Sequence, residues 1–207
     1  MPTRRSTPRT PRQEEIVDAA IDLVREGGWP HLTVRRLAKR LGVTDPALYR
    51  HFAGKGEVAL AIADRMQALL LGPVRAIAAE PATAPRRKIE RIVTHHVELL
   101  LATDGLPMLL MAEAATGDER LAAKLRQVMG EYMATLAGLV AALPRRASTA
   151  PPAEVVLQLL GLPAVVALQR RLMPGRSLSD AQVRRTLARH LRQVLPAQPG
   201  RRKEESR

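Results

Sequence analysis

TVRRLAKRLGVTDPALYRHF, residues 33–52, contains two short helical segments separated by a tight turn. Thr33 predicts an N-cap for the first helix, and Thr44 predicts an N-cap for a second helix that ends near His51. Gly42 lies between them and can adopt a positive φ, as a sharp turn requires. Two short helices joined by a three- or four-residue turn that contains glycine are typical of a helix-turn-helix unit.

This unit predicts an apolar interior and a basic outer surface. The apolar side chains of the two helices can face each other, namely Val34, Leu37 and Ala38 on the first and Ala47, Leu48 and Phe52 on the second. Residues 33–56 carry six Lys or Arg and one Asp, so the polar side chains left outside are strongly basic. A basic outer face is what phosphate binding requires.

The composition of the whole chain favours an anionic partner. Lys and Arg number 33 and Asp and Glu number 20, which gives a formal net charge of +13 over 207 residues. Nucleic acid is the first candidate for such a partner, and a membrane surface is the weaker one. The sequence has no cysteine, which excludes disulfides, Cys-ligated zinc and thiol catalysis. Aromatic residues make up 2% of the chain, so a stacking platform for single-stranded nucleic acid is disfavoured.

Outside this unit the pattern is helical almost throughout and predicts an all-α fold of about nine helices. Residues 12–54 are expected to form a three-helix helix-turn-helix domain, and residues 55–195 a larger helical body. Residues 1–11 are expected to be a disordered basic arm, and residues 196–207 a disordered tail. The expected helices span 12–27, 33–40, 44–51, 55–79, 86–102, 107–116, 118–143, 152–172 and 179–195. The arm supplies three arginines for phosphates or a minor groove, Arg4, Arg5 and Arg9.

Several other classes are disfavoured. The basic N-terminus is followed by no apolar run, which argues against a secretory signal. The apolar stretch Val155–Gln169 is fifteen residues long and contains Pro163, so we expect no membrane span and a cytoplasmic protein. No Gly-rich phosphate loop, nucleophile elbow or HExxH motif is present, so we expect neither an enzyme nor a bound cofactor. His95 and His96 are adjacent and point to different helix faces, so no metal site is expected.

The helix-turn-helix region resembles the DNA-binding domain of the tetracycline-repressor (TetR) family over about residues 12–65. The resemblance rests on Gly28-Trp29, Leu32-Thr33-Val34, Leu37-Ala38, Gly42-Val43-Thr44, the run Ala47-Leu48-Tyr49-Arg50-His51-Phe52, and Lys55. Trp29 departs from the pattern, because a smaller aromatic residue is usual there. We expect its ring to fill the seam between the first helix and the turn. The resemblance implies a homodimeric repressor that acts at the nucleoid on a near-palindromic operator of double-stranded DNA.

The second helix of such a pair enters the major groove with its N-terminal residues at base edges. Thr44 could contact a base or only cap the helix, and Asp45 could accept from cytosine or only favour the helix N-terminus. The resemblance gives Tyr49, His51 and Lys55 phosphate contacts. A single arginine here is equally well explained as part of a solvated face. The complete set of predicted DNA contacts is Thr33, Arg35, Arg36, Thr44, Asp45, Pro46, Ala47, Tyr49, Arg50, His51 and Lys55.

The resemblance also implies a small-molecule effector that binds in the body. The candidate lining residues contain five methionines, which suggests a deformable apolar cavity, although a single methionine is more often part of an ordinary core. They are Met66, Leu70, His95, His96, Leu99, Met108, Met111, Met129, Tyr132 and Met133. An aliphatic or acyl-type ligand fits this set, with His95 or His96 at its polar end. The alternative is a DNA-bound protein of the same fold that is controlled by a protein partner.

The helix expected over residues 152–172 is apolar on more than one face and should therefore be buried on two sides. The partner subunit is one explanation, and a central position in the core is the other. The residues predicted for the subunit interface are Val155, Leu159, Leu162, Val166, Leu187 and Leu191.

Overall fold

The structure, a computed structural model, describes residues 9–144, 150–173 and 175–195. These residues form nine α-helices and one short 3-10 helix, and the described ranges contain no strand, which confirms the all-α prediction. The elements are α1 (Pro11–Gly27), η1 (Trp29–His31), α2 (Val34–Leu41), α3 (Asp45–Tyr49), α4 (Lys55–Ala79), α5 (Pro85–Ala102), α6 (Leu106–Ala114), α7 (Glu119–Ala141), α8 (Pro152–Leu172) and α9 (Asp180–Val194). The expected tail and most of the expected arm, with Arg4 and Arg5, lie outside the described residues.

Helix α1 begins at Pro11, so the last residues assigned to the arm belong to the folded chain. Thr10 and Gln13 form a capping box in which each side chain binds the other residue's backbone N–H. Arg9 pairs with Asp64 of α4 at 2.6 Å, which corrects the expectation that this arginine is a free DNA contact.

The helix-turn-helix forms as its sequence predicts, with two local differences. The hydroxyl of Thr33 accepts from the backbone N–H of Arg36 at 3.2 Å, and Gly42 takes a left-handed conformation with φ of 64°. Thr44 occupies the N-cap position of α3, but its side chain makes no capping hydrogen bond. Helix α3 ends at Tyr49, two residues before the expected His51.

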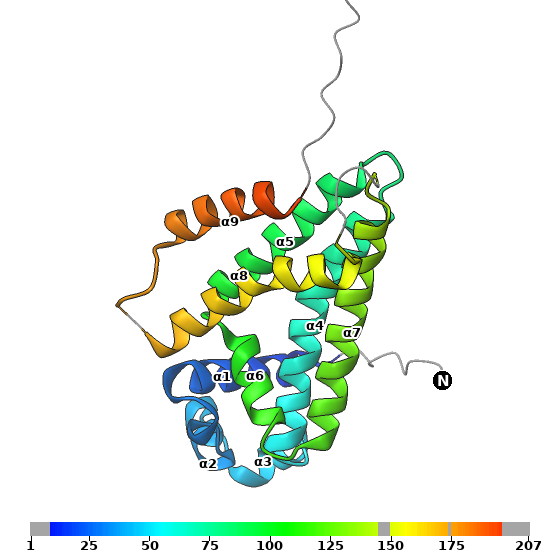
Figure 1. Cartoon of the computed structure of the whole chain (residues 1–207). Coiled ribbons are helices and arrows are strands. Elements are labelled where there is room, and N and C mark those ends of the chain that lie inside the picture. Colours follow the sequence, from blue (N-terminus) through cyan, green and yellow to red (C-terminus); the bar gives the residue numbers. More distant parts are fainter. Residues whose placement is uncertain (1–8, 145–149, 174, 196–207) are drawn as a thin grey trace, which may run out of the picture.

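Two hydrophobic cores share the helix α4. Figure 1 shows this long helix running from the end next to α3 up to the end next to α5. The first core joins α1–α3, the N-terminal half of α4 and parts of α6 and α7; we call α1–α3 with this half of α4 the head. The second core joins the C-terminal half of α4 with α5, α7, α8 and α9; we call α5–α9 with this half of α4 the body. Val58 and Ile62 lie in the first core, and Leu71 and Val74 in the second. Helix α4 is therefore a direct structural connection between the two cores.

Helix α8 has one face in the body core and one face in solvent. Val155, Leu159 and Val166 are buried within their own chain, as are Leu187 and Leu191 on α9. This corrects the predicted subunit interface, because five of its six residues cannot contact a partner, and Leu162 is only half exposed. The exposed face instead carries four large apolar side chains at helical spacing, which we call the outer stripe: Leu157, Val165, Leu168 and Leu172.

Among the described residues, α8 is the one helix whose length and composition would allow it to cross a membrane. The prediction that this segment is too short is wrong on length, since α8 spans 21 residues. The finding is weak by itself, because a core helix of a soluble protein meets the same criterion, and α8 packs against α5, α7 and α9.

Candidate nucleic-acid interface and internal cavity

The outer face of the helix-turn-helix is exposed and basic. At the start of α2, Thr33, Arg35 and Arg36 are exposed, and at the end of α3, Tyr49 is 54% exposed beside Arg50. Neither Arg35, Arg36 nor Arg50 forms an ion pair with another described residue. Free guanidinium groups on one convex surface suit binding to the phosphate backbone of DNA.

The N-terminal end of α3 presents the residues predicted for base contacts. Thr44, Asp45 and Pro46 are exposed, and Ala47 is half-buried between the two helices. Because the Thr44 hydroxyl has no capping role, it remains available for an external partner. The Asp45 carboxylate lies in the first turn of α3, where the helix dipole favours negative charge.

Lys55 and His51 are held differently from the exposed arginines. Lys55 Nζ lies 3.2 Å from Glu113 Oε1 on α6 and 5.6 Å from the ring centroid of Trp29. The carbonyl oxygen of His51 accepts from Gln13 Nε2 at 3.3 Å, and its side chain is half-buried. In this conformation the Lys55 ammonium is bound to α6, which sequence reasoning did not anticipate.

Trp29 fills the predicted seam and also reaches α6. The side chain is buried in the head core, and its Nε1 donates a hydrogen bond to the Leu109 carbonyl oxygen at 2.5 Å. A smaller aromatic residue without a ring N–H could not make this bond. Trp29 and Lys55 therefore attach the head to α6 at adjacent points.

A second attachment joins the head to the end of α8. Arg171 donates to the carbonyl oxygens of Val24 and Arg25 at 3.1 and 3.2 Å, and Arg25 pairs with Asp104 before α6. The cation thus satisfies carbonyl groups at the C-terminal end of α1, where the helix dipole favours positive charge. Helices α6 and α8 both belong to the body, so these contacts join the head to the body at several points.

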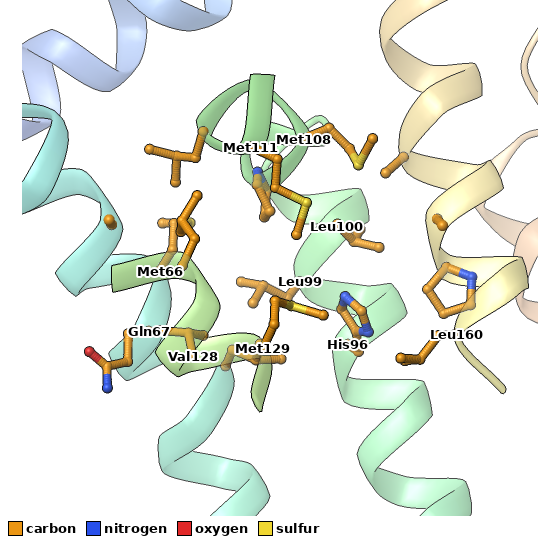
Figure 2. Close-up of a pocket in the computed structure, with 18 residues that line it drawn as sticks. Met66, Gln67, His96, Leu99, Leu100, Met108, Met111, Val128, Met129 and Leu160 are labelled. Atoms are coloured by element: carbon orange, nitrogen blue, oxygen red, sulfur yellow. The ribbon is translucent and has the colours of Figure 1, made fainter. Parts of the chain in front are cut away.

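Helices α4–α8 enclose a cavity of about 340 Å³ (Figure 2). Its volume lies within the range of about 300–1,000 Å³ that is typical of small-molecule sites. Seven of the ten predicted residues line it: Met66, Leu70, His96, Leu99, Met108, Met111 and Met129. No charged side chain is among the described residues that form the lining, so the cavity suits an apolar ligand.

The other three predicted lining residues lie elsewhere. Tyr132 is fully buried behind His96, with its hydroxyl oxygen 3.1 Å from His96 Nδ1. His95 Nε2 lies 2.8 Å from the Leu69 carbonyl oxygen on the outside of the body. Met133 is 41% exposed to solvent. Adjacent residues on a helix point in different directions, which is why His95 leaves the cavity while His96 enters it. Met133 lies one turn beyond Met129 on the same side of α7, past the end of the cavity.

The structure adds eleven lining residues that sequence reasoning missed. Most have no heteroatom and resemble ordinary core residues: Ala63, Gln67, Leu100, Pro107, Leu110, Leu125, Val128, Leu160, Pro163, Ala164 and Ala167. Four of them come from α8, which was assigned to the subunit interface. The small residues of α8 and its internal Pro163 were the sequence features that could have predicted a cavity beside this helix.

His96 is the one ionisable side chain in the lining. Burial, together with the smaller effect of the neighbouring His95, lowers its pKa from 6.5 to about 4. Burial likewise raises the pKa of the Tyr132 hydroxyl above its usual range. Both groups are therefore neutral at pH 7, and their rings meet edge to face with centroids 5.1 Å apart. Within the described ranges, no three His, Asp or Glu side chains lie together as a metal site would require.

Comparisons with known proteins agree on the head and on the fold. Residues 16–62 match the family model for bacterial regulatory proteins of the tetR family. The chain is 24% identical over 132 residues to the fatty acid metabolism regulator protein of Bacillus subtilis, an alignment that covers 64% of this chain and 68% of that protein. It is 49% identical over 53 residues to the class A tetracycline repressor from transposon 1721 of Escherichia coli, covering 26% of this chain and 24% of the repressor.

Structural similarity extends over most of the chain. The crystal structure of the transcriptional regulator FadR from Bacillus subtilis, in complex with stearoyl-CoA, superposes with a TM-score of 0.70. That match covers 88% of this chain and 97% of FadR at 17% identity, which is evidence for a shared fold.

Proposed function

We propose that this chain, which belongs to the TetR family of bacterial transcriptional regulators, is a homodimeric repressor that leaves its DNA when a small apolar ligand enters the cavity. The observation that carries the proposal is the position of the cavity. Its lining comes from α4 and α6, and these same two helices hold the head through Val58, Ile62 and the Trp29–Leu109 hydrogen bond. A ligand that displaces either helix thereby changes the position of α3.

The proposed DNA surface is the exposed face of α2 and α3. Residues 12–54 would bind the DNA, with Thr44–Ala47 at base edges and the free arginines at phosphates. Residues 55–195 would hold the effector and the subunit interface, although α4 also serves the head. We propose that the protein acts in the cytoplasm, at the nucleoid.

The DNA-binding half of the proposal is tested with the purified full chain and a random pool of duplex DNA. Rounds of selection should enrich a near-palindromic sequence, and a footprint should show protection of two half-sites. Affinity should fall steeply with salt concentration, since phosphate contacts release counterions. Failure to enrich any sequence would overturn this half.

The proposed effector is an apolar or acyl-type molecule. Support comes from the uncharged lining and from the FadR neighbour, whose crystal structure contains stearoyl-CoA. Binding favours release if the ligand prefers the conformation that does not bind DNA. Adding decanoyl-CoA to the protein–DNA complex should release the DNA, and coenzyme A alone should not. If neither decanoyl-CoA nor uncharged apolar compounds release the DNA, control by a protein partner becomes the better explanation.

The proposed subunit interface is the outer stripe on α8. Leu157 and Leu172 are each 70% exposed, and a contiguous apolar face of this kind marks an interaction site. A two-fold axis through α8 would bring the same surface of both copies together and would give two heads to match two half-sites. The mass in solution, measured by light scattering, should be twice that of the single chain.

A further inference from the structure

The polar content of the cavity is nearly confined to one side chain. Of the lining residues, only Gln67 and His96 carry nitrogen or oxygen in their side chains. Figure 2 shows the amide of Gln67 directed away from the middle of the cavity and the His96 ring at its edge. A ligand in this space therefore meets a hydrocarbon and thioether surface with one imidazole.

The hydrogen bond to Tyr132 determines which nitrogen of His96 carries the proton. The Tyr132 hydroxyl is fully buried, and His96 Nδ1 is its one hydrogen-bonding partner among the described residues. A buried O–H without an acceptor is costly, so the hydroxyl donates and Nδ1 accepts. A neutral imidazole has one donor and one acceptor, so the proton is on Nε2. His96 Nε2 has no partner among the described residues, and it is the ring nitrogen left for the cavity.

We propose that the cavity selects an uncharged, mostly hydrocarbon ligand with a single hydrogen-bond acceptor, and that the Nε2–H of His96 binds this acceptor. Ketones, esters, lactones and thioesters have such a group. A carboxylate or an ammonium is rejected, because the cavity offers no opposite charge and an unpaired ion is costly to bury. Tyr132 is a positioning residue, since it acts on the ligand only through the proton on His96.

This inference rests on the proposed function, because it takes the cavity to be the effector site. Its test uses three probes of similar length, namely 2-undecanone, undecane and decanoate, in competition with the neutral dye Nile red. The ketone should bind about tenfold more tightly than the alkane, as one neutral hydrogen bond in an apolar site allows. Decanoate at pH 7.5 should bind more weakly than the ketone.

Two variants separate the effect of the His96 donor on ligand binding from the effect of cavity shape. The double variant His96→Phe with Tyr132→Phe retains an aromatic ring at both positions and leaves no buried hydroxyl without a partner, so it should fold. It should bind the ketone more weakly than the alkane, because the buried carbonyl then has no donor. The lining variant Leu99→Met changes shape without changing polarity and should retain the preference for the ketone.

Tyr132→Phe tests the positioning role. In the wild type, nitrogen NMR of labelled histidine should show His96 protonated at Nε2. In Tyr132→Phe the second tautomer should appear, and the preference for the ketone should fall. A purely structural role for Tyr132 would change stability without moving the tautomer.

The outcomes distinguish this inference from the proposed function. Equal binding of ketone and alkane by the wild type, or tighter binding of decanoate, overturns the inference, while effector control of DNA binding still stands. If no probe displaces the dye, both the inference and the effector part of the proposed function are overturned. A ketone preference that survives in the double variant assigns the acceptor to another group and also overturns the inference.

Discussion

In the head, most of the side chains proposed for function are exposed to solvent, whereas in the body they line a cavity between helices. Arg35, Arg36 and Arg50 are exposed and form no ion pair with a described residue. The cavity has no charged lining residue and one neutral imidazole. The surface of the head therefore presents unpaired positive charges, whereas the lining of the cavity in the body presents none. Helices α4 and α6 line the cavity and also pack in the head core, so a change in one region can affect the other.

The largest effect is expected from variants that separate the two subunits of the proposed dimer, and with them the two heads. Replacing Leu157 and Leu168 in the outer stripe by glutamate should give a monomer, because two carboxylates cannot be buried against their symmetry copies. With one head per molecule, operator affinity should fall on the order of a thousandfold, since the second half-site is no longer bound within the same complex. Light scattering and fluorescence anisotropy measure the two effects.

Leu69→Glu is the matched control for this double variant, because Leu69 is 43% exposed on α4 and lies outside the outer stripe. It should remain dimeric and should bind the operator normally. A double variant that stays dimeric would assign the interface to another surface.

The second prediction concerns the neutral imidazole of the body. His96 has a pKa near 6.5 when unfolded and about 4 in the folded chain, so the unfolded chain binds more protons between these values. The contribution of His96 to the free energy of unfolding is therefore fully present at pH 7. It decreases as the pH drops from 6.5 toward 4, by up to about 3 kcal/mol. Urea unfolding at pH 7, 5.5 and 4.5 measures the free energy of unfolding. The His96→Phe, Tyr132→Phe variant lacks this loss, so its curve should converge on that of the wild type in acid; parallel curves would contradict the lowered pKa.

A smaller effect is expected from one free guanidinium of the head. Arg36→Ala should weaken operator binding by about fivefold to tenfold and should reduce the slope of log affinity against log salt by about 1. Arg185→Ala serves as the control, because this arginine of α9 is also exposed and forms no ion pair with a described residue, and α9 lies at the end of the molecule opposite α2 and α3 (Figure 1). If both variants behave alike, the exposed face of α2 is not a phosphate contact.

The smallest expected effect tests the contact that joins the two regions. Glu113→Gln removes the charge that holds Lys55 against α6, so the ammonium becomes available for a phosphate. Because a half-exposed ion pair contributes at most about 1 kcal/mol, operator affinity should rise by about threefold. Glu119→Gln, in an exposed pair on α7, should have no effect on DNA binding. A fall in affinity for Glu113→Gln would show that the pair supports the DNA-binding conformation.

The sequence predicted the head in more detail than the body. The cap at Thr33 and the left-handed Gly42 follow from local rules, and the helix boundaries agree to within one or two residues for most helices. The cavity forms where apolar side chains do not fill the space between helices. The sequence cannot tell whether a leucine such as Leu100 lines a cavity or packs in a core, because both positions require the same apolar residue. The outer stripe was missed for a related reason. Helix α8 is apolar on both faces, and the choice of Val155 or Leu157 for the exposed face depends on tertiary packing alone.

Trp29 provides the chain with a single intrinsic tryptophan fluorophore. It is the only tryptophan among the 207 residues, and its indole N–H is bound to the Leu109 carbonyl on the helix that also lines the cavity. The intrinsic fluorescence of the unlabelled protein therefore comes from the junction between head and body. Loss of this hydrogen bond, or departure of the Lys55 ammonium from the ring, changes the polarity around the indole and shifts its emission. Titrations with ligand and with DNA can thus be followed from one native residue, which reports at the point where the two regions meet.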